Sequence, residues 1–311
     1  NFKIKLKEKY MINPAIFRAY DIRGSNNDLS PELAYKIGFC FARIVLSVQN
    51  EAESNFICVG RDGRLSSREL CNALLQGIRA AGANVKYIGL VATPTLYFAD
   101  KNFSAPGSIM VTGSHNPKED NGFKMVKSNA PFFGLMIQDL RKKIEEFNWP
   151  NIEIKVNDAQ EDIDLKEQYI DRILLNRKFS ENLKIAFDPA NGAAGELVSI
   201  LCRKLPCQTF AINEKIDGNF PAHDPDPTIP KNLDQLKNYV LENNCDVGIG
   251  FDGDADRIGI ITKKGVFVPG DQLLCIYAKD VISKSPGAKI IADIKASGVI
   301  FDYVKEIGGF P

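Results

Sequence analysis

The apolar stretch Asp246-Val247-Gly248-Ile249-Gly250-Phe251 is followed directly by Asp252-Gly253-Asp254-Ala255-Asp256-Arg257. The first part predicts a buried strand, and the second predicts a polar loop that begins where the strand ends. The same order, a short apolar run and then a polar loop, recurs at residues 108–117 and 184–192. Predicted helices alternate with these strands. The chain therefore reads as βαβ units in an α/β layer architecture.

Other periodic segments extend this pattern. Strands are predicted at 56–60 and 84–90, and a third at 289–293 because Lys289 to Asp293 resembles Lys184 to Asp188. Helices are predicted from Ser66 to about Gly82, over 135–147, from about Gly195 and after Ser297. The spacing of Ser66 and Glu69 predicts a capping box at the start of the first of these helices.

Trp149-Pro150-Asn151 interrupts the pattern and predicts a domain boundary. Residues 1–10 are interpreted as a tail, because the first methionine is Met11. The predicted units are 11–149, 150–264 and 265–311, and the last reads as the start of a third unit. Transitions from a strand through aspartate to a helix at Asp62, Asp188 and Asp293 hint that the three units are related.

Three carboxylates follow the strand that ends at Phe251. Asp252, Asp254 and Asp256 alternate with small residues, so they lie on one side of an extended backbone. Like charges this close need a cation, and hard oxygen ligands select Mg²⁺ or Ca²⁺. A calcium EF-hand loop would need Gly and Glu where Arg257 and Lys263 stand. The pattern therefore favours Mg²⁺ with open positions for a phosphate oxygen.

A second polar loop, Thr112-Gly113-Ser114-His115-Asn116-Pro117, presents a serine after a strand. A serine hydrolase is disfavoured, because there is no G-x-S-x-G elbow and adjacent side chains such as Ser114 and His115 rarely face each other. The only other histidine is His223. A serine beside a metal site could instead carry a phosphoryl group.

Basic residues stand in segments that read as glycine-flanked polar loops: Arg18 and Arg23, Arg61 and Arg64, and Lys124. Such cations suit phosphates, arginine through bidentate bonds and lysine as a point charge or proton donor. The proline-rich segment at 220–228 is interpreted as a structural interdomain loop.

The composition is that of a globular protein. Of 311 residues, 44% are hydrophobic and 25% charged, with 39 basic and 39 acidic side chains. This composition excludes a disordered or collagen-like chain, and the absence of a basic excess argues against nucleic-acid or membrane-surface binding. Residues 1–147 carry 20 basic and 14 acidic side chains, whereas residues 148–264 carry 14 and 20. The charge counts alone favour compositional scatter between two domains, but the serine, arginine and carboxylate motifs favour phosphate binding in the first part and metal binding in the second.

The seven cysteines form no C-x-x-C pair, and several lie in apolar runs. They are interpreted as buried, reduced thiols of a cytoplasmic protein. No apolar run approaches the length of a membrane span, and the N-terminus does not resemble a signal peptide.

Residues 17–24, 112–117, 122–125 and 252–257 occur in the order and at the separations of the α-D-phosphohexomutase family. The chain resembles most the bacterial phosphomannomutase/phosphoglucomutase branch, from Met11 to its last residue. The resemblance implies tandem, related three-layer α/β domains with mixed sheets, of which two are complete and a third is truncated.

The resemblance also implies an isomerase that moves a phosphoryl group reversibly between C1 and C6 of a hexose phosphate. Phosphoserine and a sugar 1,6-bisphosphate would be the intermediates, and Mg²⁺ the cofactor. The implied catalytic residues are Ser114, Arg23, Lys124, Arg257 and His115; the implied phosphate-binding residues are Tyr20, Arg18, Arg61 and Asn116; the implied metal ligands are Ser114, Asp252, Asp254 and Asp256.

The sequence departs from the family in one respect. The Gly-Glu-x-Ser-Gly-His pattern of a sugar-selecting loop and the Arg-x-Ser-Gly-Thr-type pattern of a phosphate-clamping loop do not occur in it. We therefore expect this chain alone to be poorly active, and glucose and mannose stay open as substrates, with glucosamine less expected. Two alternatives remain: a Mg²⁺-dependent phosphatase with Asp252 as nucleophile, and a non-catalytic phosphosugar-binding remnant.

Overall fold

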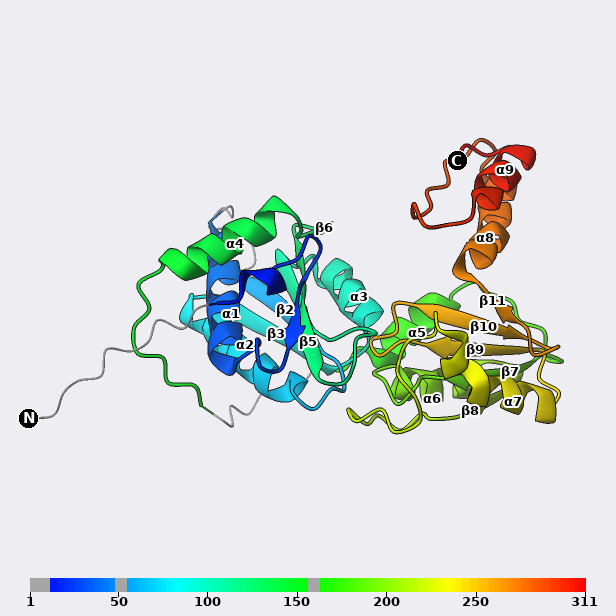
Figure 1. Ribbon diagram of the computed structural model, residues 1–311, viewed down its shortest axis with the longest axis horizontal. Helices are drawn as coiled ribbons and strands as arrows, with labels where there is room; N and C mark the ends of the chain where they lie inside the picture. Colours follow the sequence, from blue (N-terminus) through cyan, green and yellow to red (C-terminus); the bar gives the residue numbers. More distant parts are fainter. Residues whose placement is uncertain (1–11, 48–54, 156–162) are drawn as a thin grey trace, which may run out of the picture.

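The computed structural model describes residues 12–47, 55–155 and 163–311. The predicted tail at 1–10 lies outside these residues. The described chain forms two β-sheets side by side, each covered by helices, and a C-terminal pair of helices that projects from the second sheet (Figure 1). None of the described helices has the length and hydropathy needed to cross a membrane.

The first sheet is mixed. Its order is β1-β5-β4-β2-β3, with β2, β3 and β4 parallel and β1 and β5 antiparallel to their neighbours. A short strand, β6, pairs with β5. The bounds are β1 (Ile22–Ser25), β2 (Phe56–Arg61), β3 (Asn84–Leu90), β4 (Gly107–Val111), β5 (Asp120–Lys127) and β6 (Ala130–Pro131), and a 3₁₀ turn, η1 (Pro14–Ile16), precedes them.

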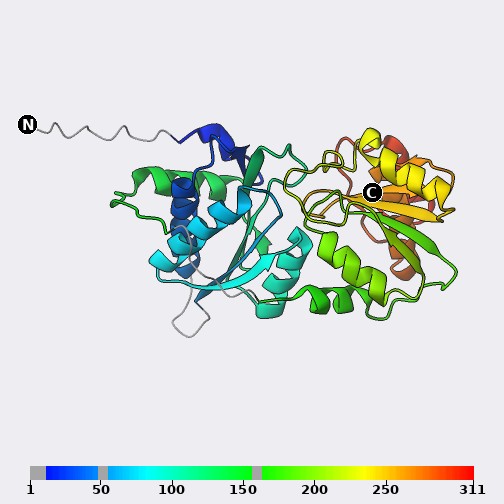
Figure 2. The ribbon, with the colours of Figure 1, turned by 90° about the horizontal axis from the view of Figure 1, so that it is seen from below.

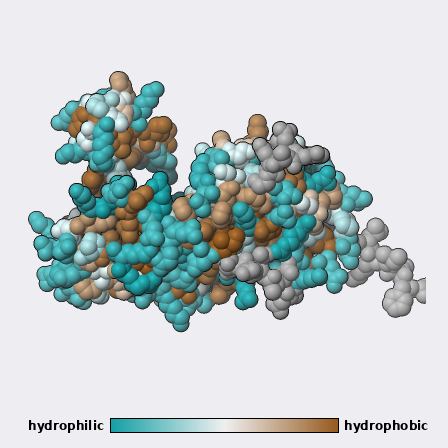
Figure 3. Space-filling model, turned by 180° about the vertical axis from the view of Figure 1, so that it is seen from behind, coloured by the Kyte–Doolittle hydropathy of each residue, from teal (hydrophilic) through white to brown (hydrophobic). Residues whose placement is uncertain are grey.

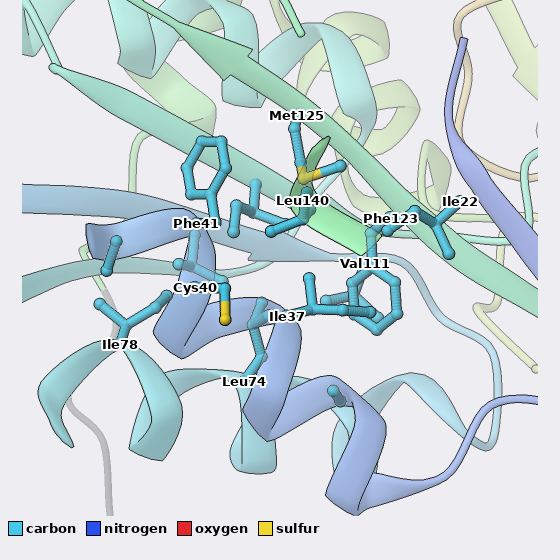
Figure 4. Close-up of a cluster of buried hydrophobic side chains, with 14 of the residues drawn as sticks. Ile22, Ile37, Cys40, Phe41, Leu74, Ile78, Val111, Phe123, Met125 and Leu140 are labelled. Carbon is cyan, nitrogen blue, oxygen red and sulfur yellow. The ribbon is translucent and has the colours of Figure 1, made fainter. Parts of the chain in front are cut away.

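Helices cover both faces of this sheet. On one face lie α1 (Pro31–Leu46), α2 (Ser67–Ala80) and α4 (Leu135–Glu146), and on the other lies α3 (Thr93–Phe103). Alternate residues of a strand enter the two cores: Ile57 of β2 packs against the first group, and Cys58 packs against α3. Figure 4 shows the larger core between α1, α2, α4 and the strands.

The second sheet repeats the plan. Its order is β11-β10-β9-β7-β8, with β7, β8 and β9 parallel and β10 antiparallel. The bounds are β7 (Lys184–Asp188), β8 (Gln208–Ala211), β9 (Val247–Phe251), β10 (Ile258–Thr262) and β11 (Phe267–Val268), with α6 (Gly195–Lys204) on one face and η2 (Pro230–Leu233) and α7 (Asp234–Glu242) on the other. The prediction of α/β units with mixed sheets is confirmed.

This repetition positions two loops. The serine loop (residues 112–117) follows β4, and the acidic loop (residues 252–257) follows β9, so the two loops occupy equivalent places in the two sheets. The helix α5 (Lys166–Leu174) packs between α3 and α6 (Figure 2). The contact includes an apolar cluster with Ile170 and Leu197. This packing brings the two loops together.

The C-terminal part is helical. The helices α8 (Gly270–Lys284) and α9 (Gly298–Glu306) pack on each other around Ile282 and Val304. The predicted strand at 289–293 is wrong, because among the described residues only Phe310 pairs there, as an isolated bridge with Lys289. Large apolar side chains remain exposed on this projecting part (Figure 3): Ile276, Tyr277, Val281, Ile291, Ile294 and Val299.

Most other predicted elements are confirmed, but the capping box is not. Ser66 has helical backbone angles, and its side chain makes no capping bond. An N-cap residue needs an extended backbone to turn its oxygen toward the first amides of the helix. The hydroxyl of Ser67 donates instead to Asp62. All seven cysteines are free thiols, as predicted, and five are buried.

Candidate active site

The serine loop and the acidic loop are in direct contact. The Ser114 hydroxyl lies 3.4 Å from Oδ2 of Asp252. Beside it, Gly253 packs against the carbonyl oxygen of Ser114 so closely that a Cβ atom at Gly253 would lie 2.5 Å from it. Glycine is therefore required for the two loops to approach, and the contact forms between residues 138 positions apart.

The three carboxylates of the acidic loop converge. One oxygen of each of Asp252, Asp254 and Asp256 lies within 4.8 Å of the others, and the first two side chains are buried. Oδ1 of Asp252 accepts the N–H groups of Asp256 and Arg257, each at 2.9 Å, which folds the loop back on itself. Burial and the charges of Asp254 and Asp256 raise the pKa of Asp252 well above its usual value. Without a nearby cation, the negative charges of these carboxylates would repel one another.

Lys124 supplies part of that positive charge. Its Nζ lies 2.7 Å from Asp254 and 2.5 Å from Asp256. Burial opposes the charge on Lys124, but the two carboxylates outweigh it and raise the lysine pKa to about 12. Burial would likewise raise the pKa of Asp254, yet Lys124 lowers it to about 2. The same Nζ lies 3.5 Å from the Ser114 hydroxyl, so one ammonium spans both loops.

The acidic cluster has a carboxylate oxygen available to bind a metal ion. Oδ1 of Asp254 is buried and has no hydrogen-bond partner among the residues that the structure describes. Its other oxygen accepts from Thr93 at 2.5 Å as well as from Lys124. Three carboxylates with a free buried oxygen form a donor set that suits a hard divalent cation. The residues present therefore fit a metal ion.

Ser114 has a strained backbone. Its φ is +55°, in the left-handed region that costs an L-residue about 1–2 kcal/mol. Its N–H donates to the hydroxyl of Thr112 at 2.8 Å, and its carbonyl accepts from Arg64 at 2.8 Å. These bonds hold the serine in a conformation that aims its hydroxyl toward Asp252 and Lys124.

Arg64 is interpreted from sequence as a phosphate-binding cation, and the structure gives it another role. The side chain is fully buried, and its terminal nitrogens donate to carbonyl oxygens of the serine loop and its neighbours: Ser114, Asn116, Pro117 and Asp120. Its Nε lies 3.2 Å from Asp62, whose carboxylate also accepts the N–H of Gly113. The guanidinium is the centre around which the serine loop folds.

We expect Arg64→Lys to destabilise the protein by about 3 kcal/mol, because a lysine cannot make four such bonds and leaves buried oxygens unpaired. Denaturant unfolding of the variant measures this. The matched control is Arg68→Lys on the exposed side of α2, which should leave the free energy of unfolding unchanged. An Arg64→Lys protein as stable as the parent would contradict this role.

A cationic cavity of about 430 Å³ opens beside Ser114. It is lined by nine residues: Arg18, Asp21, Arg23, Ser114, His115, Asn116, Lys124, Asp256 and Arg257. Four cations face two carboxylates, so the cavity favours an anion. Burial first, and then the charges of Arg257 and Arg23, lower the pKa of His115, which favours its neutral form.

Two of the implied phosphate-binding residues lie outside this lining. Arg61 donates to the Tyr87 hydroxyl at 3.0 Å. Tyr20 is 81% exposed and borders a neighbouring cavity of about 430 Å³ that also touches Lys124. The assignment of basic residues to loops is wrong for three of them: Arg23 lies in β1, Arg61 ends β2, and Lys124 lies in β5. Gly122, near Lys124, marks close packing of two strands rather than a turn, because a Cβ atom there would clash with the carbonyl oxygen of Ile22.

Sequence reasoning missed other residues of the site. The hydroxyl and the N–H of Thr93 both bond to Asp254, from the first residue of α3. Asp188 and His223 form a pair behind the acidic loop. Thr93-Pro94 at the start of a helix could have signalled the first contact, but nothing local indicates that residues so distant in sequence meet.

Comparisons with known proteins agree on one family. The family model described as "Phosphoglucomutase/phosphomannomutase, alpha/beta/alpha domain I" matches residues 14–149, and the model of domain II of the same family matches residues 167–265. A phosphomannomutase/phosphoglucomutase of Pseudomonas aeruginosa is 39% identical over 298 residues, which cover 96% of this chain and 63% of that protein. A phosphoglucomutase of Neisseria meningitidis is 38% identical over 295 residues, covering 94% and 63%.

A solved structure is also similar. The crystal structure of a phosphoglucomutase/phosphomannomutase family protein from Burkholderia thailandensis matches with a TM-score of 0.86 at 39% identity, covering 97% of this chain and 66% of that one. The present chain spans about 63% of the length of the first curated relatives it matches.

Proposed function

Because the chain belongs to the phosphoglucomutase/phosphomannomutase family of α-D-phosphohexomutases, we propose that Ser114 carries the phosphoryl group of a hexose phosphate mutase. One observation supports this above the others. The Ser114 hydroxyl lies between an ammonium at 3.5 Å and a carboxylate at 3.4 Å, at the edge of a cationic cavity. A phosphate on this oxygen would meet the positive charges it needs.

In the transfer step, the bond between phosphorus and Oγ of Ser114 breaks while a bond forms between phosphorus and a sugar hydroxyl oxygen. The serine oxygen gains a proton from the ammonium of Lys124, and the resulting amine takes up the proton that the sugar hydroxyl loses, so protons balance. The ammonium of Lys124 is within reach to protonate the serine oxygen as it leaves. Arg23 and Arg257 line the same cavity, where they offset the charge of the transferring group. Transfer from the other end of the bisphosphorylated sugar then restores phosphoserine.

We infer that Ser114, Asp252, Asp254 and Asp256 would hold Mg²⁺, supported by the convergence of the three carboxylates and the free oxygen of Asp254. Bound there, Mg²⁺ would neutralise charge on the phosphoryl oxygens. With the carboxylates neutralised in this way, the interactions that raise the pKa of Lys124 would weaken, and Lys124 would be a better proton donor. His115 and Asn116 would contact the phosphate or shape its loop, and Arg18 lines the same cavity.

The substrate would be a hexose 1-phosphate or 6-phosphate. The relatives carry both phosphoglucomutase and phosphomannomutase in their names, so glucose and mannose stay equal candidates. Tyr20 and Arg61 are kept as proposed phosphate-binding residues, although both lie outside the cationic cavity. The domain limits 11–149, 150–264 and 265–311, and a cytoplasmic location, also stay proposals.

The phosphatase alternative is less well supported. A nucleophilic carboxylate needs a free oxygen at the substrate, but Asp252 is fully buried and its Oδ1 accepts two N–H groups. A non-catalytic remnant would bind sugar phosphates without forming phosphoserine.

Phosphate uptake tests the proposal. The chain is incubated with glucose 1,6-bisphosphate and Mg²⁺, and peptide mass spectrometry locates the phosphate. We expect one phosphate, on the peptide that contains Ser114, and little conversion of glucose 1-phosphate to glucose 6-phosphate. Phosphate on another residue, or binding of the sugar phosphate with no covalent phosphate, would overturn the proposed role of Ser114.

A further inference from the structure

Asp188 and His223 form a pair that lies outside the cationic cavity. Nε2 of His223 is 3.0 Å from Oδ2 of Asp188, whose side chain is fully buried. Nδ1 of the same histidine lies 2.9 Å from the carbonyl oxygen of Asp224. Burial lowers the pKa of His223, but the bonds to Asp188 and Asp224 outweigh it and raise it. The pair connects two segments of the second sheet domain: residues 188–195, after β7, and the proline-rich loop at 220–228.

These two segments enclose the peptide groups of Gly253 in the acidic loop. The N–H of Gly253 donates to the carbonyl of Pro225 at 3.2 Å, and its carbonyl accepts the N–H of Ala193 at 2.9 Å. Gly192 also packs against the Gly253 carbonyl, where a Cβ atom would lie at 2.8 Å. Gly253 therefore sits between the two segments that Asp188 and His223 join, directly between Asp252 and Asp254.

The segments are strained and need to be held. Three residues have positive φ values: Ala190 (+51°), Asn191 (+55°) and Phe220 (+49°). This conformation costs an L-residue roughly 1–2 kcal/mol, and asparagine less. Oδ1 of Asp188 accepts the N–H of Ala190 at 2.9 Å and the Asn213 amide at 3.1 Å, which leaves Oδ2 for His223. Two contacts of this carboxylate, with Ala190 and with His223, thus each fix one of the two segments, and the third holds Asn213, which follows β8.

The proline-rich loop also reaches the first sheet domain. The ring of Phe220 lies 5.1 Å from the guanidinium of Arg64, which holds the carbonyl of Ser114. The proline-rich loop thus contacts the acidic loop at Gly253 and also the Arg64 guanidinium, which orders the serine loop.

We propose that Asp188 and His223 are positioning residues: by joining the two segments around Gly253, they hold the acidic loop in the conformation that binds a divalent cation. This inference rests on the proposed metal site. Neither residue belongs to the lining of the cationic cavity or to the three-carboxylate cluster, and both act through the backbone of Gly253. Mutation of residues that orient metal ligands in this way commonly weakens metal affinity by about 10–100-fold.

The test compares His223→Ala with His223→Gln in the full chain, by hydrogen exchange of the peptide that spans residues 252–257 and by titration with Mn²⁺ followed by electron paramagnetic resonance. In His223→Ala we expect faster exchange of this peptide and roughly 10- to 100-fold weaker Mn²⁺ binding. His223→Gln keeps a donor for Asp188 and should recover most of both. Asp171→Asn, an exposed acid on α5, is the control and should change neither.

Two results would overturn the proposal. Parental exchange of residues 252–257 in His223→Ala would show that the pair does not hold the loop. Equal losses in the alanine and glutamine variants would show a general structural role rather than a specific bond. Exchange needs no metal, so a parent chain that fails to bind Mn²⁺ would refute the metal site separately. If His223→Ala does not fold, Asp188→Asn gives the same comparison, because it keeps the volume and one acceptor oxygen but removes the charge and replaces the other acceptor by an amide donor.

Discussion

Replacing Ser114 by alanine is expected to reduce phosphate uptake from glucose 1,6-bisphosphate by at least roughly 10³-fold, the scale on which removing a covalent nucleophile acts. Ser114 is the hydroxyl that lies between Lys124 and Asp252. The nearby hydroxyls already have partners: Thr112 accepts the N–H of Ser114, and Thr93 donates to Asp254. We therefore expect neither hydroxyl to replace that of Ser114. Peptide mass spectrometry and uptake of labelled phosphate measure the loss.

Ser283→Ala is the matched control, because Ser283 is an exposed hydroxyl on α8, far from the site in sequence and in fold. It should take up phosphate at the parental rate. The free energy of unfolding of Ser114→Ala should stay near that of the parent, since Arg64 and Thr112 hold backbone atoms of residue 114 rather than its hydroxyl. Uptake by Ser114→Ala at the parental rate would contradict the proposal and revive Asp252 as a nucleophile.

Asp254→Asn is expected to weaken divalent-cation binding by about 100-fold or more. Asp254 is fully buried, and one of its oxygens has no partner within the described chain. Asparagine keeps the volume but removes the charge, and breaking a buried charge pair costs about 3–5 kcal/mol, where 1.4 kcal/mol is tenfold in affinity. Mn²⁺ titration by electron paramagnetic resonance measures the change.

Asp171→Asn, which also removes one carboxylate but on an exposed helix face, should bind Mn²⁺ as the parent does. Lys124 would keep Asp256 as a partner in the Asp254→Asn variant, so we expect the loop contact between the two sheets to persist. Unchanged Mn²⁺ affinity in Asp254→Asn would mean that the cation, if it binds, does so elsewhere.

Local sequence predicted much of this molecule because strands and turns leave local signals. The alternation of apolar runs and polar loops located β4, β7 and β9, and the carboxylates directly after Phe251 indicated a cation site. These predictions required only the two-residue period of a strand and the repulsion between close like charges. The family resemblance, which rests on the same short motifs, is confirmed by the comparisons.

Other features depend on residues far apart in the chain. The glycines beside Arg23 and Lys124 suggest loops in the sequence, but both residues lie in strands, and Gly122 allows β5 to pack closely against β1 at Ile22. The apolar run at 289–293 has strand character and still forms no strand, because a strand needs a ladder partner and the described chain offers only Phe310.

By itself, the sequence determined that this chain is built of α/β units, that one loop carries a cluster of carboxylates and another a serine, and which family it resembles. Only the tertiary structure decided that the two loops meet, that Arg64 bonds to the serine loop, that Thr93 bonds to Asp254, and that Asp188 pairs with His223. The physical reason is that local pattern specifies each strand and loop end. The contacts between the loops that follow these strands depend on how two sheets of the same topology pack around α5. No local sequence pattern indicates this packing.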